Sequence, residues 1–96
     1  MCKAMSFAFS IALTLLIVAP ASAQPRCQKY DVWANGEPAA LKPVAKRGAR
    51  AAWSERVRSE IGADYATWGR ARHQRTSCLR EQRMYSCTVS ASPCKA

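Results

Sequence analysis

The sequence predicts a small α+β domain, in which one amphipathic helix packs on a small antiparallel sheet and two disulfides stabilise the fold. Apolar residues recur every four positions between residues 45 and 61, as they do along one face of a helix. Residues 84–91 alternate in the manner of a half-buried strand. Residues 27–94 contain four cysteines, an even number. A chain of 96 residues has room for one domain at most.

The first 23 residues have the features of a secretory signal peptide. Lys3 gives a positively charged start, and an apolar run from Phe7 to Ala19 follows it. Ala21-Ser22-Ala23 then supplies the small residues that signal peptidase recognises. The alternative is an uncleaved membrane anchor, but the run is shorter than the roughly 20 apolar residues that span a bilayer. We therefore expect cleavage after Ala23 and a periplasmic or extracellular protein.

Four cysteines remain after cleavage: Cys27, Cys78, Cys87 and Cys94. In a small exported chain, this even number favours two disulfides. Such a chain has a limited core, and each disulfide typically adds about 2–4 kcal/mol of stability. Zinc is disfavoured because metal-binding cysteines usually come in closely spaced pairs. We predict no metal site and no cofactor.

Four cysteines allow three pairings, and the sequence leaves the choice open. We favour Cys78–Cys87 across a C-terminal hairpin, with Cys27–Cys94 joining the two ends of the domain. The rival pairs Cys87 with Cys94 and Cys27 with Cys78. An extended spacer of six residues would hold Cys87 and Cys94 too far apart, although Ser-Pro before Cys94 permits the chain to fold back.

Residues 24–44 are interpreted as an N-terminal arm and residues 45–96 as the disulfide-stabilised helix-hairpin domain. A short strand fits the weak alternation of residues 27–33, and Asn35-Gly36 is typical of a turn. The helix is expected from about Ala45 to Ile61, with Gly62 ending it. The large apolar residues predict the core, which comprises Trp53, Val57, Ile61, Tyr65 and Trp68.

The C-terminal part predicts two strands, Arg70–Leu79 and Met84–Ala91, which form an antiparallel hairpin. The link between them, residues 80–83, contains neither glycine nor asparagine. A tight two-residue turn of the primed types is therefore disfavoured, and we expect a looser loop. Pro93 should end the second strand.

The spacing of these residues resembles a pattern found in small exported bacterial proteins of unknown function. The pattern covers about half of the chain, and its elements here are Ala49, Trp53, Val57, Ile61-Gly62, Tyr65, Trp68, Ala71, Cys78, Cys87 and Pro93-Cys94. The resemblance implies an exported, disulfide-bonded α+β domain. It carries no assigned activity, so it transfers no site residues.

The charge of the chain is strongly positive. Fifteen Lys and Arg against six Asp and Glu give a formal net charge of +9, and ten of the cations are arginines, which suit phosphate and carboxylate partners. The candidate anion-binding residues are Arg70, Arg72, Arg75, Arg80 and Arg83. In an extended strand, Arg70, Arg72 and Arg80 would share one face. The alternative is a charged solvent face that keeps the domain soluble.

The sequence does not predict catalysis. His73 is the only histidine, and it lies among arginines without a serine, thiol or carboxylate at a recognisable spacing. Glu60 and Asp64 are the closest carboxylates on a helical spacing, but Gly62 lies between them. Paired-carboxylate hydrolysis also needs a cleft, for which this chain has little room. We predict that the protein is not an enzyme.

These observations predict an exported, non-enzymatic, small basic domain that binds or acts structurally in the cell envelope. Its expected partner is an anionic envelope component or an acidic protein, and we expect a monomer with no transmembrane segment after cleavage. Export disfavours a nucleic-acid partner. The alternative is a secreted effector, either a cationic antimicrobial or an enzyme inhibitor, but membrane-active peptides leave the apolar face of a basic helix free.

Overall fold

The computed structural model describes residues 26–96, so the predicted signal peptide, residues 1–23, lies outside the described residues. The described chain forms strand β1 (Val32–Asn35), helix α1 (Lys42–Glu60), two short 3₁₀ turns, η1 (Ala63–Tyr65) and η2 (Trp68–Arg70), and strands β2 (Arg72–Glu81) and β3 (Met84–Ser92). One helix and an antiparallel three-stranded sheet confirm the predicted α+β class. Within residues 26–96, no helix combines the length and the hydropathy needed to cross a membrane.

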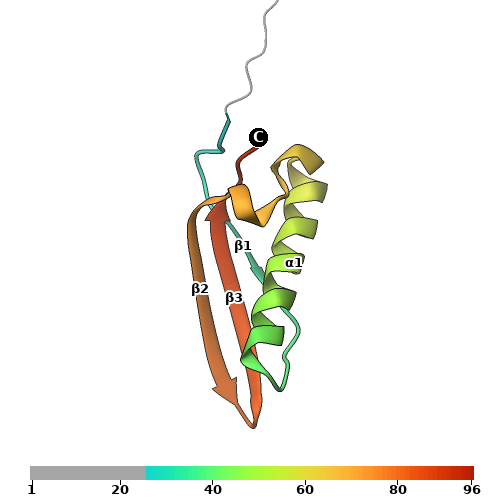
Figure 1. Ribbon diagram of the computed structural model, residues 1–96, viewed down its shortest axis with the longest axis vertical. Helices are drawn as coiled ribbons and strands as arrows, with labels where there is room; N and C mark the ends of the chain where they lie inside the picture. Colours follow the sequence, from blue (N-terminus) through green and yellow to red (C-terminus); the bar gives the residue numbers. More distant parts are fainter. Residues whose placement is uncertain (1–25) are drawn as a thin grey trace, which may run out of the picture.

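The sheet has the order β1-β3-β2, with both pairings antiparallel and β3 in the centre. Helix α1 lies along one face of the sheet and packs mainly on β3 and β1, so that it hardly touches β2 (Figure 1). All ten residues of β2 are at least partly exposed. The strand is therefore an edge that offers most of its side chains to solvent.

Periodicity explains which residues form the core. Alternate residues of β3, including Cys87, Val89 and Ala91, point to α1 and are buried, while α1 contributes a stripe of buried residues. The stripe consists of Ala45, Ala49, Trp53 and Val57, each fully buried. Of the predicted core residues, Trp53, Val57 and Tyr65 are buried. The other two, Ile61 and Trp68, are half-buried at the margin of the core.

Trp53 joins the two layers of the domain. Its indole Nε1 donates a buried hydrogen bond of 2.9 Å to the carbonyl oxygen of Val32 in β1. Its ring meets that of Trp68 edge-to-face, with the centroids 5.1 Å apart, an arrangement that aromatic pairs prefer. The helix is thus anchored to the sheet both by burial and by a specific hydrogen bond.

The helix begins three residues earlier than predicted, at Lys42, with Pro43 in its first turn. Proline is tolerated there because the first backbone N–H groups of a helix have no partner within it. The expected C-terminal glycine is in place, since Gly62 has a φ of 153°, which favours glycine, and donates to the carbonyl of Val57. The N-terminal arm is also more than a connection, because it supplies β1.

Both favoured disulfides are present, Cys27–Cys94 and Cys78–Cys87. The second cross-links directly opposed residues of β2 and β3. The first ties the start of the described chain to its end, where two backbone hydrogen bonds flank it, Gln28 N–H to Pro93 O and Lys95 N–H to Arg26 O, both 2.8 Å. The rival pairing of Cys87 with Cys94 is therefore wrong.

The loose loop expected between the hairpin strands is also wrong. Gln82 and Arg83 form a two-residue turn in which both have positive φ, 50° and 74°. Turns of this primed kind match the right-handed twist of paired strands, which explains why they connect hairpins. Here the long ladder and the Cys78–Cys87 cross-link fix the register, so the turn adopts this geometry without the glycine or asparagine that favours it.

Replacing Gln82-Arg83 by Asn-Gly should therefore stabilise the domain by about 1 kcal/mol, because non-glycine residues pay roughly 1–2 kcal/mol in the left-handed region and glycine costs more entropy on folding. Thermal unfolding should show a rise in Tm of about 4–8 °C. The control, Arg83→Gln, removes the same charge but keeps a side chain at positive φ, and should leave Tm unchanged. A double variant with an equal or lower Tm would contradict this reading of the turn.

Candidate anion-binding site

The structure separates the five arginines that the sequence grouped together. Arg70 ends η2, and Arg72 and Arg75 lie at the start of β2. Arg80 lies near the far end of β2, and Arg83 is in the hairpin turn. Ten residues of strand span about 30 Å, so the five side chains belong to opposite ends of the molecule (Figure 1).

The prediction that Arg72 and Arg80 share one face of the strand is wrong because of a β-bulge. The register shifts between Arg72 and Arg75, and His73 within the bulge has a φ of 58°. Opposed residues of a ladder lie on the same face. Arg72 and Arg75 pair with Ser92 and Ser90, on the open face of the sheet, whereas Arg80 pairs with Tyr85 on the side of the helix.

The arginines also differ in what their side chains contact. On α1, Arg56 and Arg58 form ion pairs with Glu60 and Glu55. Three arginines lie over aromatic rings: Arg50 over Trp68, Arg56 over Trp33 and Arg80 over Tyr85. In contrast, within residues 26–96 the guanidinium groups of six arginines form no ion pair, hydrogen bond or ring contact: Arg26, Arg47, Arg70, Arg72, Arg75 and Arg83. Their donors face solvent and are available to a ligand.

Three chain segments bring four of these arginines, Arg26, Arg70, Arg72 and Arg75, and two lysines to one end of the domain. The Cys27–Cys94 disulfide places the residues around Cys27 and Cys94 next to the start of β2, as both termini of the described chain lie at this end (Figure 1). The resulting group is called the basic end and comprises Arg26, Lys29, Arg70, Arg72, Arg75 and Lys95. Lys95 lies with its Nζ 5.9 Å from the centroid of the Tyr65 ring.

Two adjoining recesses lie within the basic end. One, of about 310 Å³, is lined by four of the cations together with the disulfide and Ala96; the cations are Arg26, Arg70, Arg72 and Lys95. The other, of about 430 Å³, is lined by Lys29, Arg72 and Arg75 with Cys27, three further polar residues and one carboxylate. Cys27 and Arg72 line both recesses, so the two are neighbours.

Little negative side-chain charge offsets these cations. No Asp or Glu lines the smaller recess. In the larger one, Asp31 accepts a hydrogen bond of 2.7 Å from the hydroxyl of Ser92, which occupies one of its oxygens. Asp64 lines a third recess with Arg70 and Lys95. Glu55 and Glu60 are engaged by arginines of α1, and Glu81 lies at the hairpin tip. Within residues 26–96, six cations and two carboxylates, Asp31 and Asp64, thus lie at the basic end. Further unpaired cations lie at the opposite end, in the first turns of α1 and in the hairpin turn: Lys42, Lys46, Arg47 and Arg83.

Sequence reasoning found half of this group and missed Arg26, Lys29 and Lys95. They lie more than forty residues from Arg70 in one direction and twenty-five in the other, so no local pattern connects them. The available signal was the favoured Cys27–Cys94 pairing, which places the neighbours of both cysteines together.

The larger recess also brings His73, Asp31 and Ser92 together, which the sequence did not predict. The arrangement differs from that of a catalytic triad. There the histidine lies between serine and carboxylate and takes the proton of the hydroxyl. Here Ser92 donates directly to Asp31, is only 6% exposed, and forms no hydrogen bond to His73 within the described chain. His73 is exposed on the bulge.

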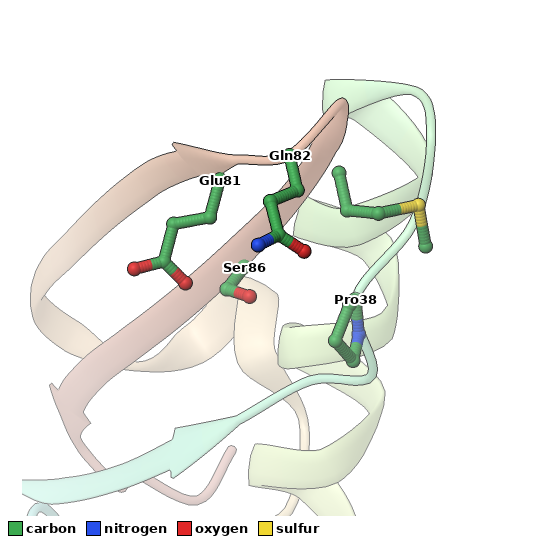
Figure 2. Close-up of a pocket in the computed structure, with 5 residues that line it drawn as sticks. Pro38, Glu81, Gln82 and Ser86 are labelled. Atoms are coloured by element: carbon green, nitrogen blue, oxygen red, sulfur yellow. The ribbon is translucent and has the colours of Figure 1, made fainter.

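A further recess, of about 600 Å³, lies at the hairpin tip and carries no cation. In Figure 2, Glu81 and Pro38 lie on opposite sides of it, with Gln82 and Ser86 between them. A lone carboxylate without a histidine, a second carboxylate or a nucleophile in reach has no recognisable catalytic role. The basic end is therefore the more distinctive chemical feature.

No group of three or more His, Cys, Asp or Glu residues within residues 26–96 is arranged to hold a metal ion. Comparison with protein-family models, characterised proteins and solved structures finds no match for this chain. The resemblance to small exported bacterial proteins stays an expectation.

Proposed function

We propose that this protein is an exported, non-enzymatic binding domain whose basic end attaches to an anionic component of the cell envelope. The observation that carries the proposal is the convergence of six cations from three chain segments, five of them without a side-chain partner in the described chain. Charges needed only for solubility can be spread over a surface. Concentrating them creates a local potential that attracts anions.

The disulfides support an exported location. Structural disulfides persist in the periplasm and outside the cell and are rare in the cytosol, and both disulfides here are structural, since one spans the hairpin and the other closes the domain. Anionic lipids, lipopolysaccharide, acidic glycans and acidic proteins are the available anions in that location. Nucleic acid is a less accessible partner there.

The packing of α1 disfavours the alternative of a membrane-disrupting antimicrobial. A peptide that inserts into a bilayer uses the apolar face of its helix, but that face of α1 is buried against the sheet through Ala49, Trp53 and Val57. Contact through the charged end leaves this core intact. The proposed binding is therefore peripheral and electrostatic.

The triple variant Arg70→Gln/Arg72→Gln/Arg75→Gln should bind vesicles containing anionic lipid about 100-fold more weakly than the wild type, since each cation near such a surface contributes about 1 kcal/mol. Wild-type binding should fall steeply as salt rises, because exposed charges are screened over about 8 Å at physiological ionic strength. Tm should not change, since exposed charges contribute little to folding. Vesicle sedimentation at two salt concentrations measures these effects.

The matched control is Lys42→Gln/Lys46→Gln/Arg47→Gln, which removes the same charge from the start of α1, at the opposite end of the domain (Figure 1). It should retain most of the wild-type affinity. Equal losses in the two triple variants would show that net charge alone drives binding. A wild type that binds neither anionic vesicles nor envelope glycans at low salt would refute the proposed function.

A further inference from the structure

We propose that the two recesses of the basic end form a site for a phosphate group, presented either by a lipid headgroup or by a soluble phosphorylated molecule. This inference rests on the proposed function and specifies the chemistry of its ligand. The site extends beyond the arginines of β2 and includes cations that the Cys27–Cys94 disulfide brings from both ends of the described chain.

The smaller recess gathers several hydrogen-bond donors from separate parts of the chain. The recess is lined by guanidinium groups from two segments, Arg26 before the disulfide, and Arg70 and Arg72 around the start of β2, while Lys95 adds an ammonium group from a third segment. A guanidinium group offers a planar fork of N–H donors that pairs with two oxygens of an anion. Forks arriving from separate segments approach a ligand from different directions.

Several guanidinium donors around one recess fit a tetrahedral anion better than a planar one. A carboxylate presents two oxygens in one plane, so one or two bidentate arginines satisfy it. A phosphate group presents its oxygens tetrahedrally around phosphorus, and it carries up to two negative charges near neutral pH. It can therefore accept from several arginines at once, which matches this lining better than a carboxylate does.

The smaller recess is accessible, and its guanidinium donors have no partner within residues 26–96. Arg26, Arg70 and Arg72 are exposed, and no carboxylate side chain occupies the smaller recess. The disulfide and the two backbone hydrogen bonds beside it hold the segment of Arg26 against that of Lys95. The positions of the backbones that carry these cations are thus fixed before a ligand arrives, which lowers the entropic cost of binding.

The test compares two soluble anions of matched net charge, inorganic pyrophosphate and citrate, by titration calorimetry on the oxidised protein at constant ionic strength. Pyrophosphate should bind at least about tenfold more tightly than citrate. The affinity for pyrophosphate should fall by at least about tenfold in the variant Arg26→Gln/Lys29→Gln/Lys95→Gln. In the control variant, Lys42→Gln/Lys46→Gln/Arg47→Gln, the affinity for pyrophosphate should stay near the wild-type value.

A lipid arm uses vesicles containing phosphatidic acid or, at equal surface charge, oleate. Preferential binding to phosphatidic acid vesicles supports the phosphate site, with pyrophosphate titration showing whether soluble phosphate also suffices. Equal binding of pyrophosphate and citrate, together with equal binding to the two kinds of vesicle, would overturn the inference but leave the proposed function intact. Wild-type affinity for pyrophosphate in the Arg26/Lys29/Lys95 variant would also overturn it.

Discussion

Trp53→Ala should lower the free energy of unfolding by about 3–5 kcal/mol, the usual cost of truncating a large buried aromatic. The side chain is fully buried at the centre of the interface between α1 and the sheet. The truncation also removes the hydrogen bond to the carbonyl of Val32 and the edge-to-face contact with Trp68. Because a small domain is only marginally stable, a loss of this size should leave the variant partly unfolded at 37 °C.

Trp33→Ala is the matched control for this prediction. The same side chain is removed, but Trp33 lies on the open face of the sheet and is 53% exposed. Its ring centroid lies 5.0 Å from the guanidinium of Arg56, and such contacts at exposed sites contribute about 0.5–1 kcal/mol. Urea denaturation of both variants measures the difference. A Trp53→Ala protein with the stability of Trp33→Ala would show that α1 is not held by this residue.

The helix and its core stripe were predictable because their signal is local. A repeat of four residues places Ala49, Trp53 and Val57 on one face of the helix, whatever the helix packs against. Only the element that covers this face, the sheet, then remains to be predicted. Strand β3 was equally accessible, since its alternation records one buried and one polar face. Strand β1 was harder, because four residues give little periodicity, and its burial depends on pairing with β3.

The turn expected at Asn35-Gly36 is wrong. Strand β1 ends at Asn35, but residues 36–38 continue without a turn. Gly36 also has no positive φ. A Cβ placed on it would lie 2.5 Å from the backbone N of Ala49, so glycine is needed because the chain passes close to α1. That approach depends on how the helix packs, which no local pattern in the sequence records.

The candidate site was only half predictable for a related reason. The arginines of β2 are adjacent in the sequence, but the bulge at His73 shifts their faces, and a bulge leaves no clear local signal. Arg26, Lys29 and Lys95 join the site through pairing at long range, which a disulfide connectivity can suggest but periodicity cannot. Long-range contacts therefore determine the site, whereas local ones determine the helix.

The second large effect concerns the disulfide that assembles the basic end. Cys27→Ala/Cys94→Ala should destabilise the domain by about 4 kcal/mol, and Cys78→Ala/Cys87→Ala by about 2.5 kcal/mol, according to the chain-entropy model. The difference arises because the first cross-link joins residues 67 apart in sequence and the second joins residues 9 apart. The longer loop restricts the unfolded chain more.

Packing losses should largely cancel in this comparison. Each disulfide joins one buried cysteine, Cys94 or Cys87, to one half-buried cysteine, Cys27 or Cys78, so each double variant removes a similar amount of buried sulfur. Denaturation midpoints of the two variants, measured at equal m-value, give the difference directly. A larger loss on removing Cys78–Cys87 would show that the short cross-link acts mainly by supporting the tight hairpin turn in the folded state. It would also show that the closure of the two ends depends on the backbone hydrogen bonds around Pro93 rather than on the disulfide.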